Sequence, residues 1–293
     1  MHHGISRRAC LQALLLLPFA ARGQQPDAAR IVAINWAAAE TLLTLNITPL
    51  AISDSGYFRR RIARPALPAS VQDVGPFWEP NLELLQALRP SLIISDALSP
   101  ALMTQMRTIA PLETVPVYPA RADLWQALAD WTQTLAQRFA VSAEPWLQQA
   151  EAEMAGYRAR LRSHAGASVL VTVLNQDGRH VTIYGANSLA DAVLRQLGLV
   201  NAWQTPVSPM GLVTQSIEHV ATTHCDWLFY SELPTTLTRI TRTRQPDLLW
   251  QQLPPVAQGF SRELQHFFPF GGMATALMLA RQITAALTGQ QHG

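Results

Sequence analysis

Aromatic and basic side chains gather in three short segments of this 293-residue sequence. Residues 57–61 read Tyr-Phe-Arg-Arg-Arg, residues 76–78 read Pro-Phe-Trp, and residues 266–270 read His-Phe-Phe-Pro-Phe. Aromatic faces remove apolar ligand surface from water, and the planar fork of arginine forms charge-assisted hydrogen bonds with anionic oxygen atoms. The segments therefore suit a bulky, partly apolar ligand with an oxygen-rich centre. Ordinary packing of the rings and a solvated basic loop are the alternatives.

The motifs of common enzyme classes are missing from the sequence. It has no Gly-x-Ser-x-Gly nucleophile motif and no His-Glu-x-x-His zinc motif, and the absence of lysine excludes a phosphate loop that ends in Gly-Lys. Cys10 lies in a segment that we expect to be removed, and Cys225 is expected to be a buried structural thiol. We predict a binding protein rather than an enzyme, with no resident cofactor and no metal held directly by side chains.

The first half of the chain alternates short apolar strands with helices. This alternation indicates βα units around a mostly parallel sheet. Two of the aromatic segments follow predicted strands, so they should lie at the sheet edge where open α/β proteins bind ligands. The predicted strands are 30–35, 50–53, 71–74, 92–95 and 115–118, and the predicted helices are 36–45, 80–88 and 101–110.

A helical region from residue 123 to residue 164 separates this series from a second one. Pro145 interrupts it, and residues 143–163 would form a helix about 30 Å long with Ser142 as its cap. One face of this helix carries Trp146, Ala150, Met154, Tyr157 and Leu161. The second series has predicted strands at 168–174, 181–184 and 226–230 and predicted helices at 188–196, 217–222 and 273–287.

These patterns predict an α/β fold of two Rossmann-like lobes that are joined by a single long helix, with a ligand cleft between them. A single doubly wound domain is the alternative. The chain is 48% hydrophobic and 14% charged, which excludes global disorder and allows a sizeable core.

The N-terminus reads as an export signal. Ser6-Arg7-Arg8 precedes an apolar run from Leu11 to Ala21, which is too short for a membrane span and resembles a twin-arginine signal. Cleavage after Gly23 would leave 19 basic and 20 acidic side chains, so we expect no nucleic-acid partner. We predict a signal peptide at 1–23 and a periplasmic location.

Several motifs in both halves resemble those of periplasmic binding proteins for iron-siderophores and cobalamin. In the first half they are Arg-Ile-Val-Ala-Ile-Asn-Trp at 30–36 with Glu40, Asp-Val-Gly at 73–75 and Glu-Pro-Asn-Leu-Glu-Leu-Leu at 79–85. In the second half, residues 184–189, 198–203, 216–218 and 270–271 are similar to the ferric hydroxamate-binding type. The resemblance implies an N-terminal lobe at 28–141, a bridging helix at 142–165 and a C-terminal lobe at 166–289.

The resemblance implies that the protein captures a ferric siderophore between the lobes and delivers it to an inner-membrane ABC permease. Hydroxamate-binding members hold the iron centre with an arginine and a tyrosine. The arginine position matches Phe77 in this chain, and the tyrosine position falls at or near Ser99. Two tryptophans of the family pocket match Arg61 and Met210. The predicted ligand-binding residues are Trp36, Tyr57, Arg60, Arg61, Phe77, Trp78, Ser99, Met210, Phe268 and Phe270.

The resemblance also implies docking residues for the permease, at Glu83 and Glu218. Both fall in the first turn of a predicted helix, so a capping role is the alternative. We expect the protein to act as a monomer.

The ligand is less defined than its carrier. The arginines at 59–61 favour a chelate with negative charge, such as a carboxylate- or catecholate-containing ferric siderophore. Haem, cobalamin or another metal chelate is the alternative, with Tyr57 and His266 as candidate haem ligands. A secreted α/β enzyme is the third interpretation.

Overall fold

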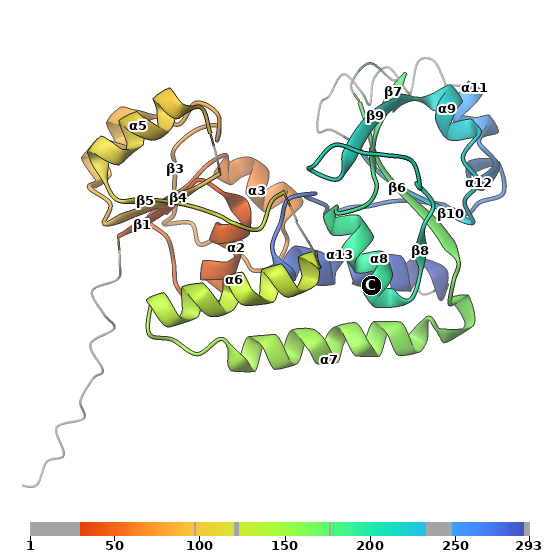
Figure 1. The fold of residues 1–293 in the computed structure, drawn as a ribbon, viewed down its shortest axis with the longest axis horizontal. Coiled ribbons are helices and arrows are strands. Elements are labelled where there is room, and N and C mark those ends of the chain that lie inside the picture. Colours follow the sequence, from red (N-terminus) through yellow and green to blue (C-terminus); the bar gives the residue numbers. More distant parts are fainter. Residues whose placement is uncertain are drawn as a thin grey trace, which may run out of the picture.

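Two α/β lobes, each built on its own sheet, make up the structure. The computed structural model describes residues 30–289, apart from 97, 120–122, 176, 178 and 233–247. The export signal predicted at 1–23 lies outside the described residues. Figure 1 shows the lobes side by side, with helix α7 running from beneath one lobe to beneath the other.

The first sheet is entirely parallel, as the alternation of strands and helices predicts. Its order is β3-β2-β1-β4-β5. The carboxyl ends of its strands therefore lie along one edge, and the segments that follow β1 to β4 meet there. The strands are β1 Ile31–Ala33, β2 Ala51–Ile52, β3 Gln72–Asp73, β4 Leu92–Ser95 and β5 Leu112–Thr114, and the helices are α2 Trp36–Thr44, α3 Ser55–Arg61, α4 Leu82–Leu88 and α5 Pro100–Ile109.

Two elements of this lobe differ from the prediction. The strand expected at 115–118 lies earlier, at β5, because Pro116 lacks the N–H that a ladder requires. The basic segment 57–61, expected to be a loop, belongs to α3. Its N-cap Asp54 has φ 43° and makes no side-chain capping bond, so complete burial of Phe58 rather than a local signal accounts for this helix.

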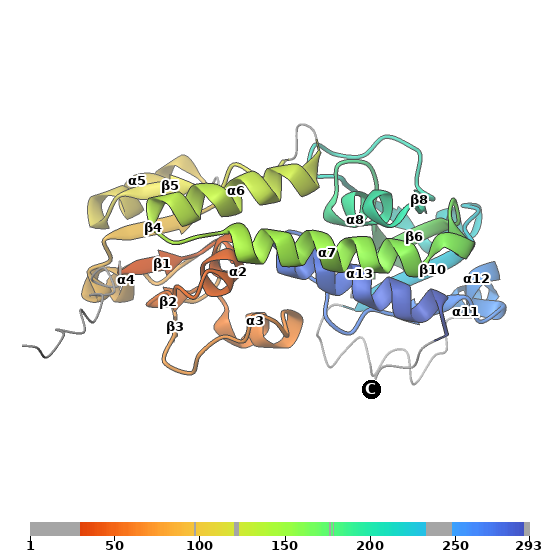
Figure 2. The ribbon, with the colours of Figure 1, turned by 90° about the horizontal axis from the view of Figure 1, so that it is seen from below.

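Two helices carry the chain between the lobes, α6 (Leu124–Arg138) and α7 (Glu144–Arg160). The 17 residues of α7 span about 26 Å. Ala143, rather than the predicted Ser142, is the N-cap, although the Glu144 amide still donates to Ser142 Oγ at 3.3 Å. The helix ends before Leu161, earlier than predicted, and a 3₁₀ turn at Arg162–His164 follows. Figure 2 shows α7 lying along α13 (Met273–Leu287), which it contacts.

The second sheet is mixed, whereas the Rossmann-like lobe that we predicted would have a parallel one. Its order is β11-β10-β6-β7-β9, with β8 also paired to β6. Strand β7 is antiparallel to β6 because a short connection returns the chain directly after β6, and β9 in turn pairs antiparallel with β7. The strands are β6 Ser168–Leu174, β7 His180–Tyr184, β8 Val200–Asn201, β9 Leu212–Ser216, β10 Trp227–Glu232 and β11 Ser261–Glu263, and the remaining helices are α8 Leu189–Leu197, α9 Ile217–Ala221, α11 Leu248–Gln252 and α12 Pro254–Ala257.

One buried hydrophobic cluster joins the two lobes. It includes Ile31 of β1, Leu42 of α2, Val171 of β6 and Ile283 of α13. The lobes are therefore packed through α13 as well as connected by the chain. Within the described part of the chain, no helix is both long and apolar enough to cross a membrane.

Candidate functional site

The N-terminal residues of the predicted site follow four neighbouring strands. Trp36 begins α2 after β1, Tyr57 lies on α3 after β2, Trp78 follows β3 and Ser99 follows β4. Because these strands are parallel, all four positions lie at the carboxyl edge of the first sheet. The fold therefore brings these predicted residues to one edge, where ligands of open α/β sheets bind.

Aromatic rings from both halves of the chain meet between the lobes. We define the junction cluster as Trp36, Tyr57, Tyr118, Phe268 and Phe270. The ring centroids of Trp36 and Phe268 are 4.4 Å apart, and those of Trp36 and Tyr57 are 5.3 Å apart. Phe270 lies 5.6 Å from Tyr118 and 6.1 Å from Phe268, both edge to face. Tyr57, Phe268 and Phe270 remain half-buried, so they present partly open ring surface.

Two side chains of the first lobe, the buried Glu40 and the half-buried Tyr118, fix the segment that carries these phenylalanines. The Glu40 carboxylate accepts hydrogen bonds from the Gly272 amide (3.2 Å), the Thr275 amide (2.6 Å) and Thr275 Oγ1 (2.5 Å). Tyr118 Oη donates to the Gly271 carbonyl oxygen at 2.8 Å. The backbone approaches closely here, since a Cβ at Gly272 would lie 3.1 Å from Glu40 Oε1 and 3.3 Å from the Ala37 carbonyl oxygen and would crowd both.

Burial changes the protonation chemistry of this pair. It raises the pKa of the Glu40 carboxyl to about 7, although the hydrogen bonds from Thr275 and Gly272 act in the opposite direction. It also raises the pKa of Tyr118 well above its usual value, and the nearby Glu40 and Asp96 carboxylates add to that shift. Glu40 and Tyr118 were not among the predicted site residues. A glutamate inside the otherwise apolar run of α2 was the one available signal, since its partners lie 232 to 235 residues away.

The two arginines of the predicted site have different surroundings. Arg61 is 8% exposed and donates from Nη1 to Ser231 Oγ at 2.9 Å and from Nε to Tyr57 Oη at 3.2 Å. It therefore joins α3 to β10 of the other lobe. Arg60 is exposed, and its guanidinium lies 5.5 Å from the centre of the Tyr57 ring. Arg60 is thus the arginine of this pair that faces solvent beside the junction cluster.

Phe77 and Trp78 form a second aromatic group, which we call the exposed pair. Their exposed fractions are 43% and 62%, and their rings meet edge to face with centroids 5.0 Å apart. Large apolar side chains held open in this way are typical of ligand or partner contacts. The pair extends the aromatic surface of the carboxyl edge beyond the junction cluster.

The remaining predicted ligand residues occupy helix-terminal and turn positions. Ser99 is exposed and caps α5, where its Oγ accepts from the Leu102 amide at 3.4 Å. Met210 is half-buried in the turn before β9. The neighbouring Gly211, at φ 76°, packs so tightly that a Cβ would come within 2.5 Å of the Ser188 amide nitrogen. The start of α8 therefore fixes the turn that holds Met210.

The two predicted docking glutamates are both exposed in first turns. Glu83 lies at the start of α4, capped by Asn81, and Glu218 lies at the start of α9, capped by Ser216. The backbone amide of Glu218 and the Ser216 hydroxyl lower the pKa of the Glu218 carboxyl. Both side chains are thus available as surface carboxylates, one on each lobe.

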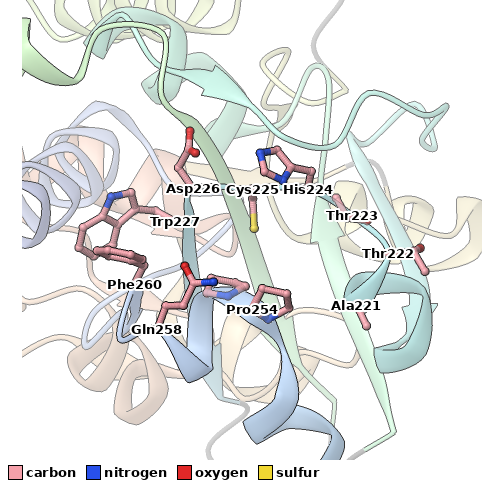
Figure 3. Close-up of a pocket in the computed structure, with 11 residues that line it drawn as sticks. Ala221, Thr222, Thr223, His224, Cys225, Asp226, Trp227, Pro254, Gln258 and Phe260 are labelled. Carbon is pink, nitrogen blue, oxygen red and sulfur yellow. The ribbon is translucent and has the colours of Figure 1, made fainter.

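A cavity of about 440 Å³ near Cys225 offers a different candidate site. Figure 3 shows the thiol pointing toward Pro254 and Gln258, whereas the carboxylate of Asp226 points away from it. Cys225 is half-buried at this cavity, rather than fully buried as expected, because the cavity leaves one side of it open. Partial burial still raises the pKa of its thiol to about 11, so the group stays a thiol at neutral pH and is a poor nucleophile. Asp226 accepts from the Ser168 amide and hydroxyl instead. The cavity carries no catalytic arrangement, and the described residues contain no group of three or more potential metal ligands.

Comparisons with known proteins agree with this geometry. A family model described as a periplasmic binding protein matches residues 31–259. The chain is 29% identical, over 98% of both chains, to the iron(3+)-hydroxamate-binding protein FhuD of Escherichia coli (strain K12).

Solved structures show the same architecture. The Fe³⁺–Desferal-bound siderophore-binding protein FhuD of Vibrio cholerae superposes with a TM-score of 0.80 and 26% identity, covering 90% of this chain and 100% of that one. FeuA of Bacillus subtilis, complexed with ferri-bacillibactin, gives a TM-score of 0.71 at 15% identity, covering 89% and 93%, which is a likeness of fold alone. The chain belongs to the periplasmic binding protein family.

Proposed function

We propose that this protein captures a ferric siderophore between its two lobes, in the periplasm, and delivers it to an inner-membrane ABC permease. The observation that carries the proposal is the meeting of aromatic rings from both lobes, Trp36 with Phe268, beside the exposed Arg60. A ferric chelate is bulky and partly apolar, and it suits ring surface combined with a few polar anchors. The hydroxamate-binding relatives support iron chelates as the ligand class.

The ligand would be carried rather than transformed. No catalytic constellation accompanies the aromatic surface in the described residues, and iron would enter and leave as part of its chelate. We propose lobe boundaries at 28–141 and 166–289, a bridging segment at 142–165, and a monomeric protein released from its signal near Gly23.

The chelate is proposed to carry negative charge. Arg60 presents a guanidinium to solvent over the Tyr57 ring, and the adjacent Arg59 is also exposed. Guanidinium groups form short, strong hydrogen bonds with carboxylate and catecholate oxygens. Phe77 stands where the resemblance places the arginine of hydroxamate-binding members, so the iron centre would be contacted by different groups here.

Tryptophan fluorescence tests the proposed function. Trp36 and Trp78 lie at the carboxyl edge of the first sheet, so a bound chelate should quench their emission. The chain without its signal would be titrated with hydroxamate, carboxylate and catecholate ferric chelates, with the iron-free chelators as controls. Saturable quenching by one ferric class supports the proposal. Quenching by haem or cobalamin alone would replace it, and Tyr57 or His266 would then be tested as haem ligands.

We further propose that Glu83 and Glu218 dock onto the permease. Docking through separated surface charges affects association more than ligand affinity. The double variant Glu83→Ala/Glu218→Ala should therefore bind the ferric chelate as the wild type does but fail to support its uptake by cells. Normal uptake would show that the permease recognises another surface, and Glu144→Ala on α7 serves as the matched helix-start control.

A further inference from the structure

A second pocket, of about 570 Å³, lies between α7 and α13. Its volume falls in the usual range for small-molecule sites. None of the ten predicted ligand-binding residues lines it. Arg64 and Pro65 contribute to its wall from the first lobe, while most of the wall comes from the two helices. The pocket is therefore separate from the candidate site described above.

Regular faces of two neighbouring helices build the pocket. On α7, the lining residues Trp146, Gln149, Glu153 and Tyr157 are spaced by three or four positions, so they share one side of the helix. On α13, Ala274, Leu277 and Arg281 have the same spacing, and Met278 lies beside Leu277. The apolar stripe predicted for α7 is thus divided between two roles. Ala150 and Met154 are buried, whereas Trp146 and Tyr157 stay half-buried at the pocket.

The pocket wall is held in place by hydrogen bonds. The Gln282 side chain accepts from the Gln265 amide at 2.9 Å and donates to the His266 carbonyl oxygen at 2.8 Å. His266 Nδ1 lies 3.1 Å from the carbonyl oxygen of Arg60 on α3. These bonds attach the 265–266 segment to α13 and to the first lobe, so the pocket is formed before any ligand enters.

The charges around the pocket are unbalanced. Arg64 and Arg281 are exposed lining residues, and neither guanidinium makes a hydrogen bond or an ion pair with another described residue. Glu153, the single acidic lining residue, accepts a hydrogen bond from Gln149 Nε2 at 2.8 Å. Two guanidinium groups with unused donors therefore border a floor that includes Leu277, which is 5% exposed.

We propose that this pocket binds a small amphiphilic organic anion, with a carboxylate or sulfonate at Arg64 and Arg281 and an aromatic or branched apolar group against Trp146 and Met278. The charge-assisted hydrogen bonds would make the pocket selective for an anion, and the apolar contacts would contribute affinity by removing apolar surface from water. Because the wall takes Arg64 and Pro65 from the first lobe and Arg281 from α13, the bound anion would also link the first lobe to α13. This inference does not depend on the siderophore role.

Titration with 8-anilinonaphthalene-1-sulfonate, an aromatic anion whose fluorescence rises in apolar surroundings, tests the proposal. N-phenyl-1-naphthylamine is a neutral probe of similar shape. The chain without its signal should bind the anion at least tenfold more tightly than the neutral probe. Arg64→Gln/Arg281→Gln should weaken anion binding at least tenfold and leave the neutral probe unaffected. The matched control Arg107→Gln/Arg179→Gln removes two exposed arginines elsewhere and should bind both probes as the wild type does.

Three results would overturn the proposal. Unchanged anion binding in Arg64→Gln/Arg281→Gln would show that these arginines do not hold the anion. Equal weakening in the control variant would indicate attraction by overall charge. Loss of binding in Phe77→Ala/Trp78→Ala, with retention in the arginine variant, would place the probe at the exposed pair instead.

Discussion

The junction between the lobes and the loop after β3 carry aromatic rings in opposite surroundings. At the junction, Trp36 is 5% exposed and donates from Nε1 to the Ser53 carbonyl oxygen at 2.9 Å. In the loop, Trp78 is 62% exposed and its ring contacts Phe77. The first environment fixes geometry through satisfied buried groups and leaves only parts of Tyr57, Phe268 and Phe270 open to a ligand, whereas the second leaves both of its rings largely open. The two regions should therefore respond to mutation in opposite ways.

Removing the Glu40 carboxylate should give the largest effect on the junction. Glu40→Ala leaves the Gly272 and Thr275 donors without their acceptor in a fully buried place and opens a cavity. We expect a loss of about 4 kcal/mol in the free energy of unfolding, from the unsatisfied donors and the cavity together. Urea unfolding measures it, with exposed Glu83→Ala as the control. A loss similar to that of the control would contradict the structural role of Glu40.

Protonation of the same carboxyl should make the junction sensitive to pH. Burial raises the pKa of Glu40 from 4.5 to about 7 in the folded chain. The folded chain therefore holds this proton more tightly, so the stability from this group is complete below pH 4.5 and is lost as the pH rises through about 7. Between pH 5 and pH 8 we expect the wild type to lose about 2–3 kcal/mol more than Glu40→Gln, which cannot ionise.

Unfolding measured in urea at both pH values for both proteins checks this difference. Parallel pH profiles for the wild type and Glu40→Gln would show that the carboxyl does not titrate in this range.

The exposed pair should show the reverse pattern. Phe77→Ala and Trp78→Ala remove rings that the folded chain leaves largely in water, so the melting temperature of the empty protein should stay nearly unchanged. If the rings cover a ferric chelate, each substitution should weaken its binding by about 2 kcal/mol. Calorimetric titration and thermal melting separate the two quantities. A large loss of stability without any loss of affinity would assign the pair to packing.

The sequence predicted where helices and strands lie better than it predicted which distant side chains contact each other. The helix at Met273–Leu287 and the strand at Ser168–Leu174 were predicted with their observed bounds, because apolar periodicity is a local signal. Ser188 caps α8 and Ser216 caps α9, because a serine hydroxyl satisfies a free amide of the first turn. Helices and strands that depend on local signals could therefore be predicted from the sequence.

Features that depend on contacts between distant parts of the chain could not be predicted from the sequence. Helix α3 lacks a side-chain cap, so its existence depends on burial of Phe58 in the tertiary core. The hydrogen bonds from Arg61 to Ser231, from Tyr118 to Gly271 and between Glu40 and Thr275 join residues more than 150 positions apart, and no periodicity reports such pairings. The order of strands and loops predicted that the candidate site lies at the carboxyl edge of the first sheet. Which of its side chains are buried in contacts and which are exposed to a ligand could be seen only in the packed structure.

The smallest predicted effects separate two adjacent arginines. The Arg61 guanidinium donates hydrogen bonds to Ser231 and Tyr57, so Arg61→Ala should lower the free energy of unfolding by about 1.5–2 kcal/mol. Arg60 faces solvent beside the Tyr57 ring, so Arg60→Ala should leave stability unchanged and weaken binding of a negatively charged ferric chelate by about 1–1.5 kcal/mol. The affinity loss should shrink at high salt, because screening already weakens exposed charge interactions. Unfolding and titration at low and high salt measure both effects. If Arg60→Ala lost stability and Arg61→Ala lost only affinity, the surroundings assigned to the two side chains would be reversed, and the boundary between the fixed junction and the open ligand surface would have to be redrawn between β2 and β3.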